Sequence, residues 1–239
     1  MNKVKFQQEI LKLFPFLKSD FFAAVEVYKN FLQAKNKQFN LTNLDKDQDI
    51  YSKYFYESLV PYASINLSKI NSILDIGSGS GIPGILLKLV YPNVNLTIIE
   101  ATGKKVEFMK ELVDKLNIDN VEILHQRAEE IKPSQREKFD LVTSRAVGEL
   151  KVILEISTPY AKVNGLIVEP KSSKYLEEEK SAKNLIKSLD LSKEKDIEFT
   201  SINGIFHHVF VYKKTAKTNL KYPRSWKEIT KSYGQNFNC

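Results

Sequence analysis

An apolar run that breaks into closely spaced glycines constrains this chain more than any other feature. It reads Ile73-Leu74-Asp75-Ile76-Gly77-Ser78-Gly79-Ser80-Gly81-Ile82-Pro83-Gly84. The apolar residues suit a strand covered on both faces, and the alternating glycines permit positive φ and a close approach of the backbone to a ligand. Pro83 fits the first turn of a following helix, where its missing N–H costs little. The stretch therefore predicts a strand, a nucleotide-binding turn and a helix.

The same stretch fits two classes of cofactor. Gly79, Gly81 and Gly84 have the G-x-G-x-x-G spacing of dinucleotide-binding proteins, which alone is a weak signal. An acid two positions before three alternating glycines, here Asp75 before Gly77, is instead similar to the loop of class I methyltransferases, which bind S-adenosylmethionine. A glycine-rich turn without a ligand is the plainer alternative, but such a turn is weakened by its glycines without any gain in packing.

Composition and length place the chain among globular α/β proteins. Its 239 residues suffice for one large domain with a buried core, or for such a domain with a small appendage. Apolar residues make up 42%, and no run of about 18 uncharged apolar residues could span a bilayer. The first residues lack the apolar core of a signal peptide, so we expect a cytoplasmic protein without a membrane partner.

Cysteine and histidine usage argues against a metal site. The single cysteine, Cys239, leaves no disulfide framework and no cysteine-based metal site or nucleophile. The three histidines, His125, His207 and His208, lack the spacing of metal ligands. We expect no metal.

The net charge of +7 is concentrated at the two ends of the chain. Residues 1–40 carry +4 and residues 171–239 carry +6, whereas residues 41–170 carry −3. This distribution fits a polyanion that docks on the flanking segments while a cationic cofactor sits centrally. A solvated, lysine-rich surface explains the charge almost as well.

Alternating elements predict a doubly wound sheet. Amphipathic helices are predicted at 6–17 and 21–32, with a third at 50–59 that ends near Pro61. Strands are predicted at 73–76, 94–99, 121–124, 139–144, 165–169, 197–202 and 206–212, with helices between them that include 103–116, 150–158 and 173–189. A hairpin at Asn203-Gly204 would add an antiparallel strand to an otherwise parallel sheet. We predict a Rossmann-like α/β methyltransferase fold with seven strands and helices on both faces. The predicted units are an N-terminal helical cap (1–66), the core (67–213) and a basic, aromatic tail (214–239).

Two charged residues stand where strands of such a sheet end. Glu100 follows the second strand about 20 residues after the glycine loop, where a carboxylate accepts both ribose hydroxyls of a bound nucleoside. It could instead cap the helix after Thr102. Arg145 lies beyond the fourth strand and could hold a phosphate or the cofactor carboxylate bidentately. A structural arginine paired with an acid is the alternative.

Several motifs in the same order resemble the glucose-inhibited division protein B family, over about residues 20–170. They are Asn40-Leu41-Thr42, the aromatic helix that ends in Glu57-Ser58-Leu59, the glycine loop, Gly103-Lys104-Lys105 and Ser144-Arg145-Ala146. The family's members are 16S rRNA guanine-N7 methyltransferases of the bacterial small subunit. The chain departs from the family's usual residues at Tyr54, Glu57 and Ser172.

The resemblance implies S-adenosylmethionine as the cofactor and 16S rRNA, or the small ribosomal subunit, as the partner. It further implies guanine 527 of the 530 loop as the target. We also expect a monomeric enzyme. Cofactor contacts of the family fall at positions that match Gly77, Ile82, Ala128, Glu129 and Arg145. The loop motif adds Asp75, Gly79 and Gly81, and the acid at the end of the second strand adds Glu100. Glu129 as a plain surface acid is the alternative to its role beside the adenine.

The C-terminal stretch combines basic and aromatic residues. Positions 213–231 hold seven basic residues and one acid. Lysines suit phosphates and aromatic rings suit unpaired bases, so an ordered RNA-binding segment is as plausible as a disordered tail. The RNA-binding candidates are Lys171, Lys213, Lys214, Lys217, Lys221, Arg224 and Trp226.

The chemistry implied by the resemblance needs no general base. Guanine N7 presents a lone pair, so transfer requires only proximity and orientation, and Arg145 is the candidate for positioning. N7 faces the deep groove of A-form RNA, so the target base should be unpaired or flipped. The alternatives are an NAD-dependent oxidoreductase using the same glycine loop and a non-catalytic RNA-binding protein of the same fold.

Overall fold

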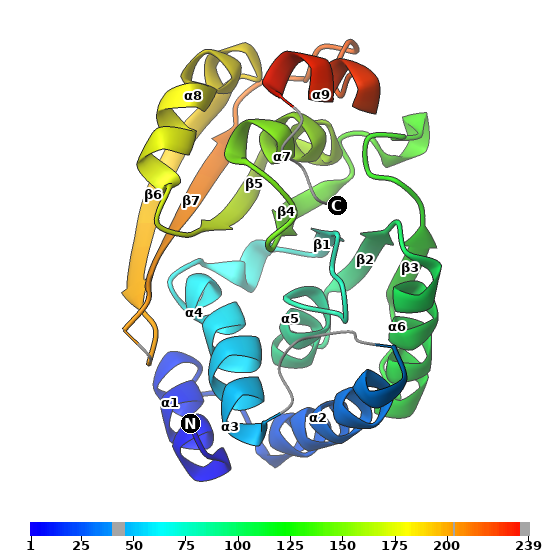
Figure 1. The fold of residues 1–239 in the computed structure, drawn as a ribbon, viewed down its shortest axis with the longest axis vertical. Helices are drawn as coiled ribbons and strands as arrows, with labels where there is room; N and C mark the ends of the chain where they lie inside the picture. The colour runs from blue at the N-terminus through cyan, green and yellow to red at the C-terminus, as the bar shows by residue number, and fades with distance from the viewer. Residues whose placement is uncertain (40–45, 203, 235–239) are drawn as a thin grey trace.

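A seven-stranded sheet in the order β3-β2-β1-β4-β5-β7-β6 runs through the molecule (Figure 1). The structure is a computed structural model that describes residues 1–39, 46–202 and 204–234. The five strands from β3 to β5 are parallel, and β7 is antiparallel to both of its neighbours. The strands are β1 (Ser72–Ile76), β2 (Asn95–Glu100), β3 (Val121–His125), β4 (Phe139–Ser144), β5 (Ala161–Lys171), β6 (Leu191–Thr200) and β7 (Phe206–Lys214).

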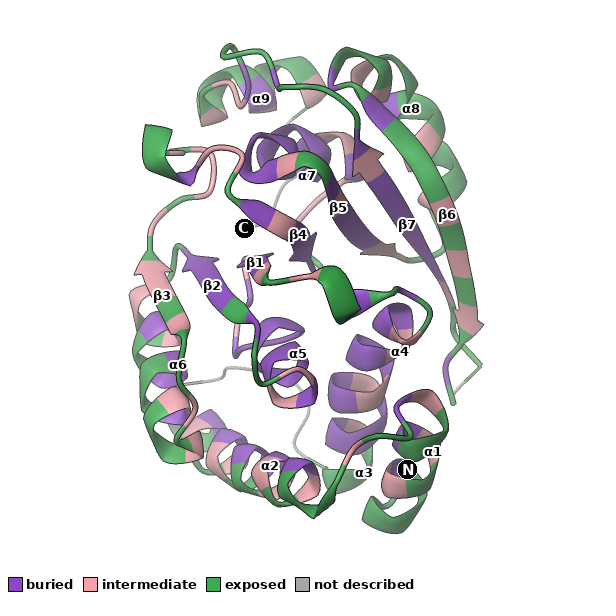
Figure 2. Cartoon of the chain, turned by 180° about the vertical axis from the view of Figure 1, so that it is seen from behind, coloured by how far each residue is buried: buried purple, intermediate pink, exposed green. Residues whose placement is uncertain are grey.

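Helices cover both faces of this sheet (Figure 2). Neighbouring residues of β1 show why the central strands are continuously apolar: Ile73 packs into the core on one face and Leu74 into the core on the other. The helices are α1 (Lys3–Leu13), α2 (Ser19–Phe39), α3 (Asp47–Asp49), α4 (Glu57–Ala63), α5 (Gly84–Val90), α6 (Gly103–Leu116), α7 (Leu150–Ser157), α8 (Tyr175–Ser188) and α9 (Trp226–Tyr233). The π-helix η1 (Ile50–Tyr56) and the short 3₁₀ turns η2 (Leu67–Lys69), η3 (Pro133–Gln135) and η4 (Thr158–Tyr160) complete the chain.

The N-terminal helices share one apolar core with α5, α6 and the sheet. Phe6 and Ile10 of α1 and Phe14, which follows this helix, are buried in it together with Tyr28 of α2 and Phe55 of η1. This packing explains their helical spacing in the sequence. It also sets α2 beside the turn between β1 and α5, because the buried Tyr28 hydroxyl donates to the Ser80 carbonyl at 2.5 Å.

The third predicted helix has an irregular middle. Helix α3 leads directly into the π-helix η1, and α4 then ends at Ala63, two residues beyond Pro61. A π-helix shifts the hydrogen-bond register of the backbone and is frequent at functional sites. The family-like motif at residues 40–42 lies outside the described residues.

Two strands begin earlier than their sequence patterns indicated. β5 begins at Ala161 rather than Gly165, and β6 at Leu191 rather than Ile197. The first half of β6 is charged because this strand is at the edge of the sheet and exposes most of those side chains (Figure 2). An edge strand of this kind has no clear alternation of apolar residues to reveal it.

The C-terminal segment contains a capped helix, α9. Ser225 caps α9 with its side chain, and Glu228 closes the capping box. Ile229 of α9 is buried in the core beneath α7 and α8. The described part of this segment is therefore folded onto the core, whereas its binding to RNA stays a prediction.

Candidate functional site

The turn after β1 adopts a conformation that only glycine accepts easily. Gly77, Gly79 and Gly81 have φ of 65°, 64° and 102°. A Cβ on Gly77 would lie 2.7 Å from a methyl group of Val147, so this position has no room for a side chain. A Cβ on Gly79 would meet no atom within 4 Å, so the backbone is open there to an approaching ligand.

Asp75 lies beneath this turn and holds it in shape. Its Oδ2 accepts hydrogen bonds from the Ser78 hydroxyl at 2.5 Å and the Gly84 amide at 2.8 Å. Burial raises the pKa of this carboxyl to about 7, although both hydrogen bonds oppose the rise. The side chain is fully buried and does not line the neighbouring cavity, so Asp75 supports the loop.

Glu100 joins the end of β2 to the glycine loop. Its Oε2 accepts from the Gly79 amide at 3.0 Å, and its Oε1 accepts from the Thr102 amide at 2.9 Å. Thr102 is the N-cap of α6, so Glu100 also supports the start of that helix. The nucleoside-binding and helix-capping interpretations of Glu100 are therefore compatible, because the residue also lines the cavity and each carboxylate oxygen can accept a further hydrogen bond.

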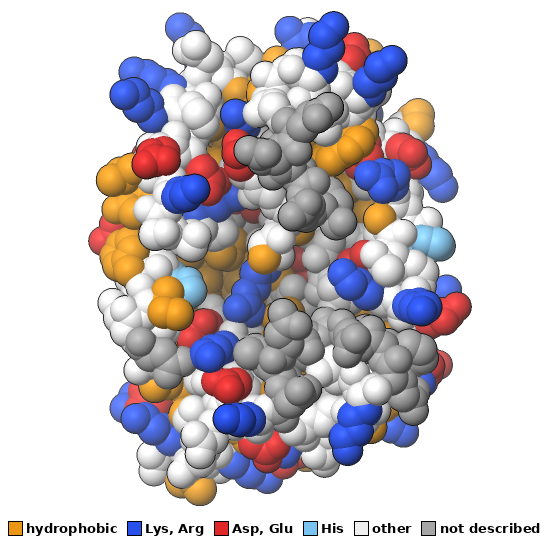
Figure 3. Space-filling view, in the orientation of Figure 1, with side chains coloured by type: hydrophobic (Ala, Val, Ile, Leu, Met, Phe, Trp, Pro, Cys, Tyr) orange, Lys and Arg blue, Asp and Glu red, His pale blue; other side chains and the backbone are white. Residues whose placement is uncertain are grey.

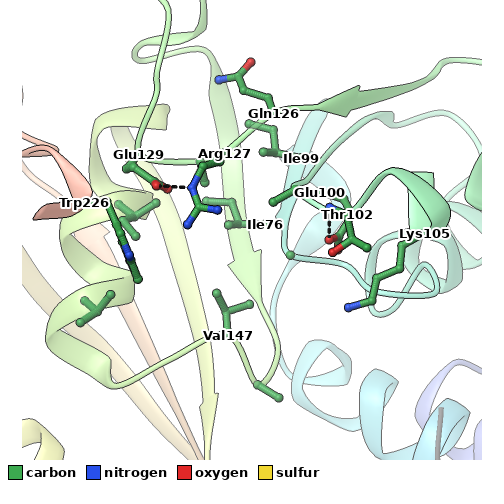
Figure 4. Close-up of a pocket in the computed structure, with 16 residues that line it drawn as sticks. Ile76, Ile99, Glu100, Thr102, Lys105, Gln126, Arg127, Glu129, Val147 and Trp226 are labelled. Carbon is green, nitrogen blue, oxygen red and sulfur yellow. Dashed lines mark hydrogen bonds and ion pairs between the residues drawn. The ribbon is translucent and has the colours of Figure 1, made fainter. Parts of the chain in front are cut away.

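A cavity of about 280 Å³ lies at the carboxyl ends of β1, β2 and β4 (Figure 4). This is the point where the strand order reverses, the usual ligand site of an open α/β sheet. One end is polar, with Glu100, Thr102 and Lys105. The rest of the wall is mainly apolar and is formed by Ile76, Gly77, Ile99, Ala101, Ala128, Ala146, Val147, Val152 and Ile156, with Gln126, Arg127, Glu129 and Trp226.

Trp226 closes the end of the cavity opposite Glu100. The guanidinium carbon of Arg127 lies 5.7 Å from the centroid of the Trp226 ring. Arg127 Nε forms an ion pair with Glu129 Oε1 at 2.8 Å (Figure 4). Sequence reasoning assigned Trp226 to RNA and did not identify Arg127. Trp226 reaches the cavity because the chain after β7 passes back to the carboxyl end of β1, and no local signal in the sequence indicates this path.

The structure divides the predicted cofactor residues into two groups. Gly77, Glu100, Ala128 and Glu129 line the cavity. The others lie around it without lining it, and they are Asp75, Gly79, Gly81, Ile82 and Arg145. Gly79 still bears on the cavity, because its amide orients the Glu100 carboxylate.

Arg145 faces away from the cavity, toward the π-helix. Its guanidinium donates to the Lys53 carbonyl at 2.8 Å, to the Tyr54 carbonyl at 3.4 Å and to the Ser58 hydroxyl. Burial lowers the pKa of this arginine, and nearby acidic groups oppose the shift. Arg145 thus connects the end of β4 to the cap helices. This contact resembles the alternative of a structural arginine, but its main partners are backbone carbonyls and not an acid.

Three predicted RNA-binding cations are engaged within the protein. Lys214 is wholly buried and donates to Glu137 at 3.1 Å and to the Ala161 carbonyl at 2.8 Å, so its assignment to RNA was wrong. Lys171 pairs with Glu178 at 3.3 Å, and its side chain is 8% exposed. Arg224 pairs with a buried carboxylate of α7. A buried cation needs such partners. The basic composition of the segment did not reveal them, because the partners are distant in the sequence.

The remaining basic candidates lie at the amino ends of the parallel strands, opposite the cavity. Lys213 is the second-last residue of β7 and pairs with Leu166 in the middle of β5; because β7 runs antiparallel to β5, the chain leaves β7 toward the start of β5. Exposed Lys217 and Lys221 follow directly after β7. On the face shown in Figure 3, basic side chains are spread among acidic ones and do not gather in one patch.

Among the described residues, no group of three or more histidine, cysteine, aspartate or glutamate side chains is placed to hold a metal ion. No helix among them is long and apolar enough to cross a membrane.

Comparison with known proteins connects this geometry to one family. The family model for rRNA small subunit methyltransferase G matches residues 22–204. A ribosomal RNA small subunit methyltransferase G from Ureaplasma parvum is 44% identical over 234 residues, covering 97% of this chain and 99% of the relative. The protein of that name from Malacoplasma penetrans is 46% identical over 206 residues, covering 86% and 87%.

Solved structures show the same fold at low identity. A methyltransferase from Aquifex aeolicus that depends on S-adenosylmethionine superposes with a TM-score of 0.57 and 18% identity, covering 74% of this chain and 97% of that one. A precorrin-6y C5,15-methyltransferase from Geobacter metallireducens gives a TM-score of 0.51 and 18% identity, covering 66% and 87%. The predicted class I methyltransferase fold is confirmed. The family and structure matches are to methyltransferases, so they argue against an NAD-dependent oxidoreductase.

Proposed function

The chain belongs to the rRNA small subunit methyltransferase G family, and we propose that it transfers the methyl group of S-adenosylmethionine to N7 of a guanine in 16S rRNA. The family supplies the cofactor and the rRNA substrate. The nucleotide, expected to be guanine 527 of the 530 loop, and the ring nitrogen are our inference from the resemblance.

The observation that carries the proposal is the contact between Glu100 and Gly79. A carboxylate at the end of β2, held by an amide of the glycine loop at 3.0 Å, is oriented toward a cavity at the switch point of the sheet. Hydroxyl groups of a ribose are donors that such a carboxylate accepts. The apolar walls at Ile99 and Val147 suit a flat base, so the residues present fit an adenosine-bearing cofactor.

When bound, this cofactor supplies a methyl group on a positively charged sulfur. The protein has only to hold that group in line with the guanine nitrogen, since the nitrogen already carries a lone pair. We assign this orientation to the glycine loop, Glu100 and the loop after β4. No side chain has to remove a proton before transfer.

The RNA is expected to approach the carboxyl ends of the strands, because the methyl group must be presented there. Lys104 is exposed at the start of α6 and Lys105 lines the cavity beside it, so these lysines are better placed for nearby phosphates than Lys217 or Lys221. A monomeric enzyme acting in the cytoplasm stays a prediction. So does the division of the chain at residues 66 and 213.

Two measurements test the proposal. Nucleoside mapping of small-subunit rRNA, from cells with and without this protein, should show one 7-methylguanosine that depends on it. Calorimetry with S-adenosylhomocysteine should show binding in a one-to-one ratio. If the rRNA carries the same set of modifications in both strains, the proposed substrate is wrong, and an absence of heat at millimolar ligand would exclude the proposed cofactor site.

A further inference from the structure

Three buried polar atoms without hydrogen-bond partners gather beside Arg145. They are the Tyr54 hydroxyl of η1, Oε1 of Glu57 at the start of α4, and Nε2 of His207 in β7, each unpaired among the described residues. The side chain of Glu57 is only 7% exposed, and Oε2 lies 3.6 Å from His207 Nε2, which is beyond hydrogen-bond distance. Buried polar groups are nearly always paired, so three unpaired ones from three elements require an explanation.

This cluster and the cofactor cavity lie on opposite sides of one short loop. After β4, Ala146 and Val147 line the cavity, whereas the preceding Arg145 turns to the cap and donates to the carbonyls of Lys53 and Tyr54. The charge of Arg145 reaches all three groups of the cluster, since it acts on the pKa of each. The cluster therefore lies next to the loop that borders the cofactor cavity, so a base held there by one edge could present another edge to the cofactor.

The protonation states give the cluster a defined hydrogen-bonding character. Burial raises the pKa of Glu57, while the positive charges of Arg145 and Lys53 oppose that rise. Burial and Arg145 both lower the pKa of His207, so its ring is neutral at pH 7. The cluster thus offers an acidic acceptor, a neutral imidazole and a phenolic hydroxyl.

We propose that Glu57, Tyr54 and His207 bind the Watson–Crick edge of the guanine that is methylated. This inference rests on the proposed function. N7 must stay free for the methyl group, so the base has to be held by its other polar atoms. Its N1–H and 2-amino group are adjacent donors that match one carboxylate, and O6 is an acceptor for the hydroxyl or the imidazole N–H.

The same arrangement rejects adenine. Adenine presents an acceptor at N1 and no 2-amino donor, so its edge would place a lone pair against the Glu57 carboxylate. A site built to hydrogen-bond a particular edge discriminates strongly because its buried polar groups stay unpaired with the wrong base. His207 is more exposed than Glu57, with 22% of its side chain accessible, so the base is expected to enter from the β7 side.

The decisive experiment combines a protein variant with a base analogue. Methyl transfer is measured with wild-type protein and Glu57→Gln, on 16S rRNA assembled by ligation around a synthetic segment with guanine or inosine at the target. Inosine lacks only the 2-amino group. Glu198→Gln is the matched control, because this β6 carboxylate is 56% exposed and lies outside the cluster.

With wild-type protein and Glu198→Gln, we expect kcat/KM to be about tenfold or more lower on inosine than on guanine. With Glu57→Gln, we expect at least a tenfold lower kcat/KM on guanine and nearly equal values for the two bases. A purely structural role for Glu57 would lower both values equally and keep the discrimination, and that result would overturn the inference. If wild-type protein binds S-adenosylhomocysteine but methylates no guanine N7, it is the proposed function that fails.

Tyr54→Phe gives a second, independent test. The hydroxyl has no hydrogen-bond partner within the part of the chain that the structure describes, so its removal should leave the melting temperature unchanged or raise it, while kcat/KM on guanine falls several-fold. Unchanged activity in this variant would remove Tyr54 from the site. Binding of S-adenosylhomocysteine should be the same as in wild type.

Discussion

Arg224 and Glu155 are 69 positions apart and form a two-point ion pair. The Arg224 Nε donates to one carboxylate oxygen at 2.8 Å and Nη2 to the other at 2.6 Å, while the Tyr233 hydroxyl adds a third contact at 2.7 Å. Glu155 has no exposed surface. The pair fastens the C-terminal segment to α7, and this places Trp226 at the cavity.

Arg224→Ala should therefore release α9 and weaken the fold. The Glu155 carboxylate would keep Tyr233 but lose its cationic partner, so we expect about 2–4 kcal/mol less free energy of unfolding. Urea denaturation measures this, and exposed Lys221→Ala is the control. A loss below about 0.5 kcal/mol would show that the pair does not hold the segment.

Trp226 should report cofactor binding directly, because it is the only tryptophan of the chain. Adding S-adenosylhomocysteine should change its fluorescence in a saturable way, and NAD should not. Trp226→Ala should raise the Kd for S-adenosylhomocysteine about 5- to 30-fold by calorimetry, since it removes one apolar wall of the cavity. An unchanged Kd would mean that α9 borders the cavity without contributing to it.

Glu169 should make stability depend on pH in a predictable direction. Burial raises the pKa of this carboxyl to about 7, against opposing contributions from Lys171, Ser144 and Ser157. Its pKa in the unfolded chain is about 4.3, so the folded state binds the extra proton between these values, and stability falls as the pH rises from about 4 to about 7. Glu169→Gln mimics the protonated acid, so its melting temperature should rise relative to that of wild type as the pH rises through this range. Thermal melts between pH 5 and 8 measure the difference, and parallel pH profiles of the two proteins would contradict the prediction.

Lys214→Met tests the corrected role of a residue first assigned to RNA. The substitution leaves Glu137 and the carbonyls of Thr158 and Ala161 without the ammonium group, so we expect a loss of about 2–4 kcal/mol in the free energy of unfolding. Binding to 16S rRNA, measured by filter retention at 4 °C where the variant stays folded, should equal that of wild type. Exposed Lys217→Met is the matched control and should not change stability. Weaker RNA binding by folded Lys214→Met would restore the original assignment.

Local sequence was enough for the fold, because the strongest signals are short-range. The stretch from Ile73 to Gly84 encodes a strand, a turn with positive φ and the start of a helix within twelve residues, and the structure contains each of them. The alternation of strands and helices then restricts the topology to a few parallel arrangements. Edge strand β6 was less predictable, because its first half faces solvent and lacks an apolar period.

The cofactor loop and the family were thus determined by the sequence alone, since the residues that encode them are neighbours along the chain. The directions of Arg145, Lys214 and Trp226 were decided only by the tertiary structure. Arg145 could have faced either side of β4, and the π-helix provides carbonyls on one of them. Lys214 and Trp226 lie in one basic segment, yet the first is buried against the start of β5 and the second reaches the cavity. The groups that these residues contact are distant in the sequence. A buried charge needs a partner and a packed ring needs a neighbour, so these contacts, and not the composition of the segment, decide the role of each residue.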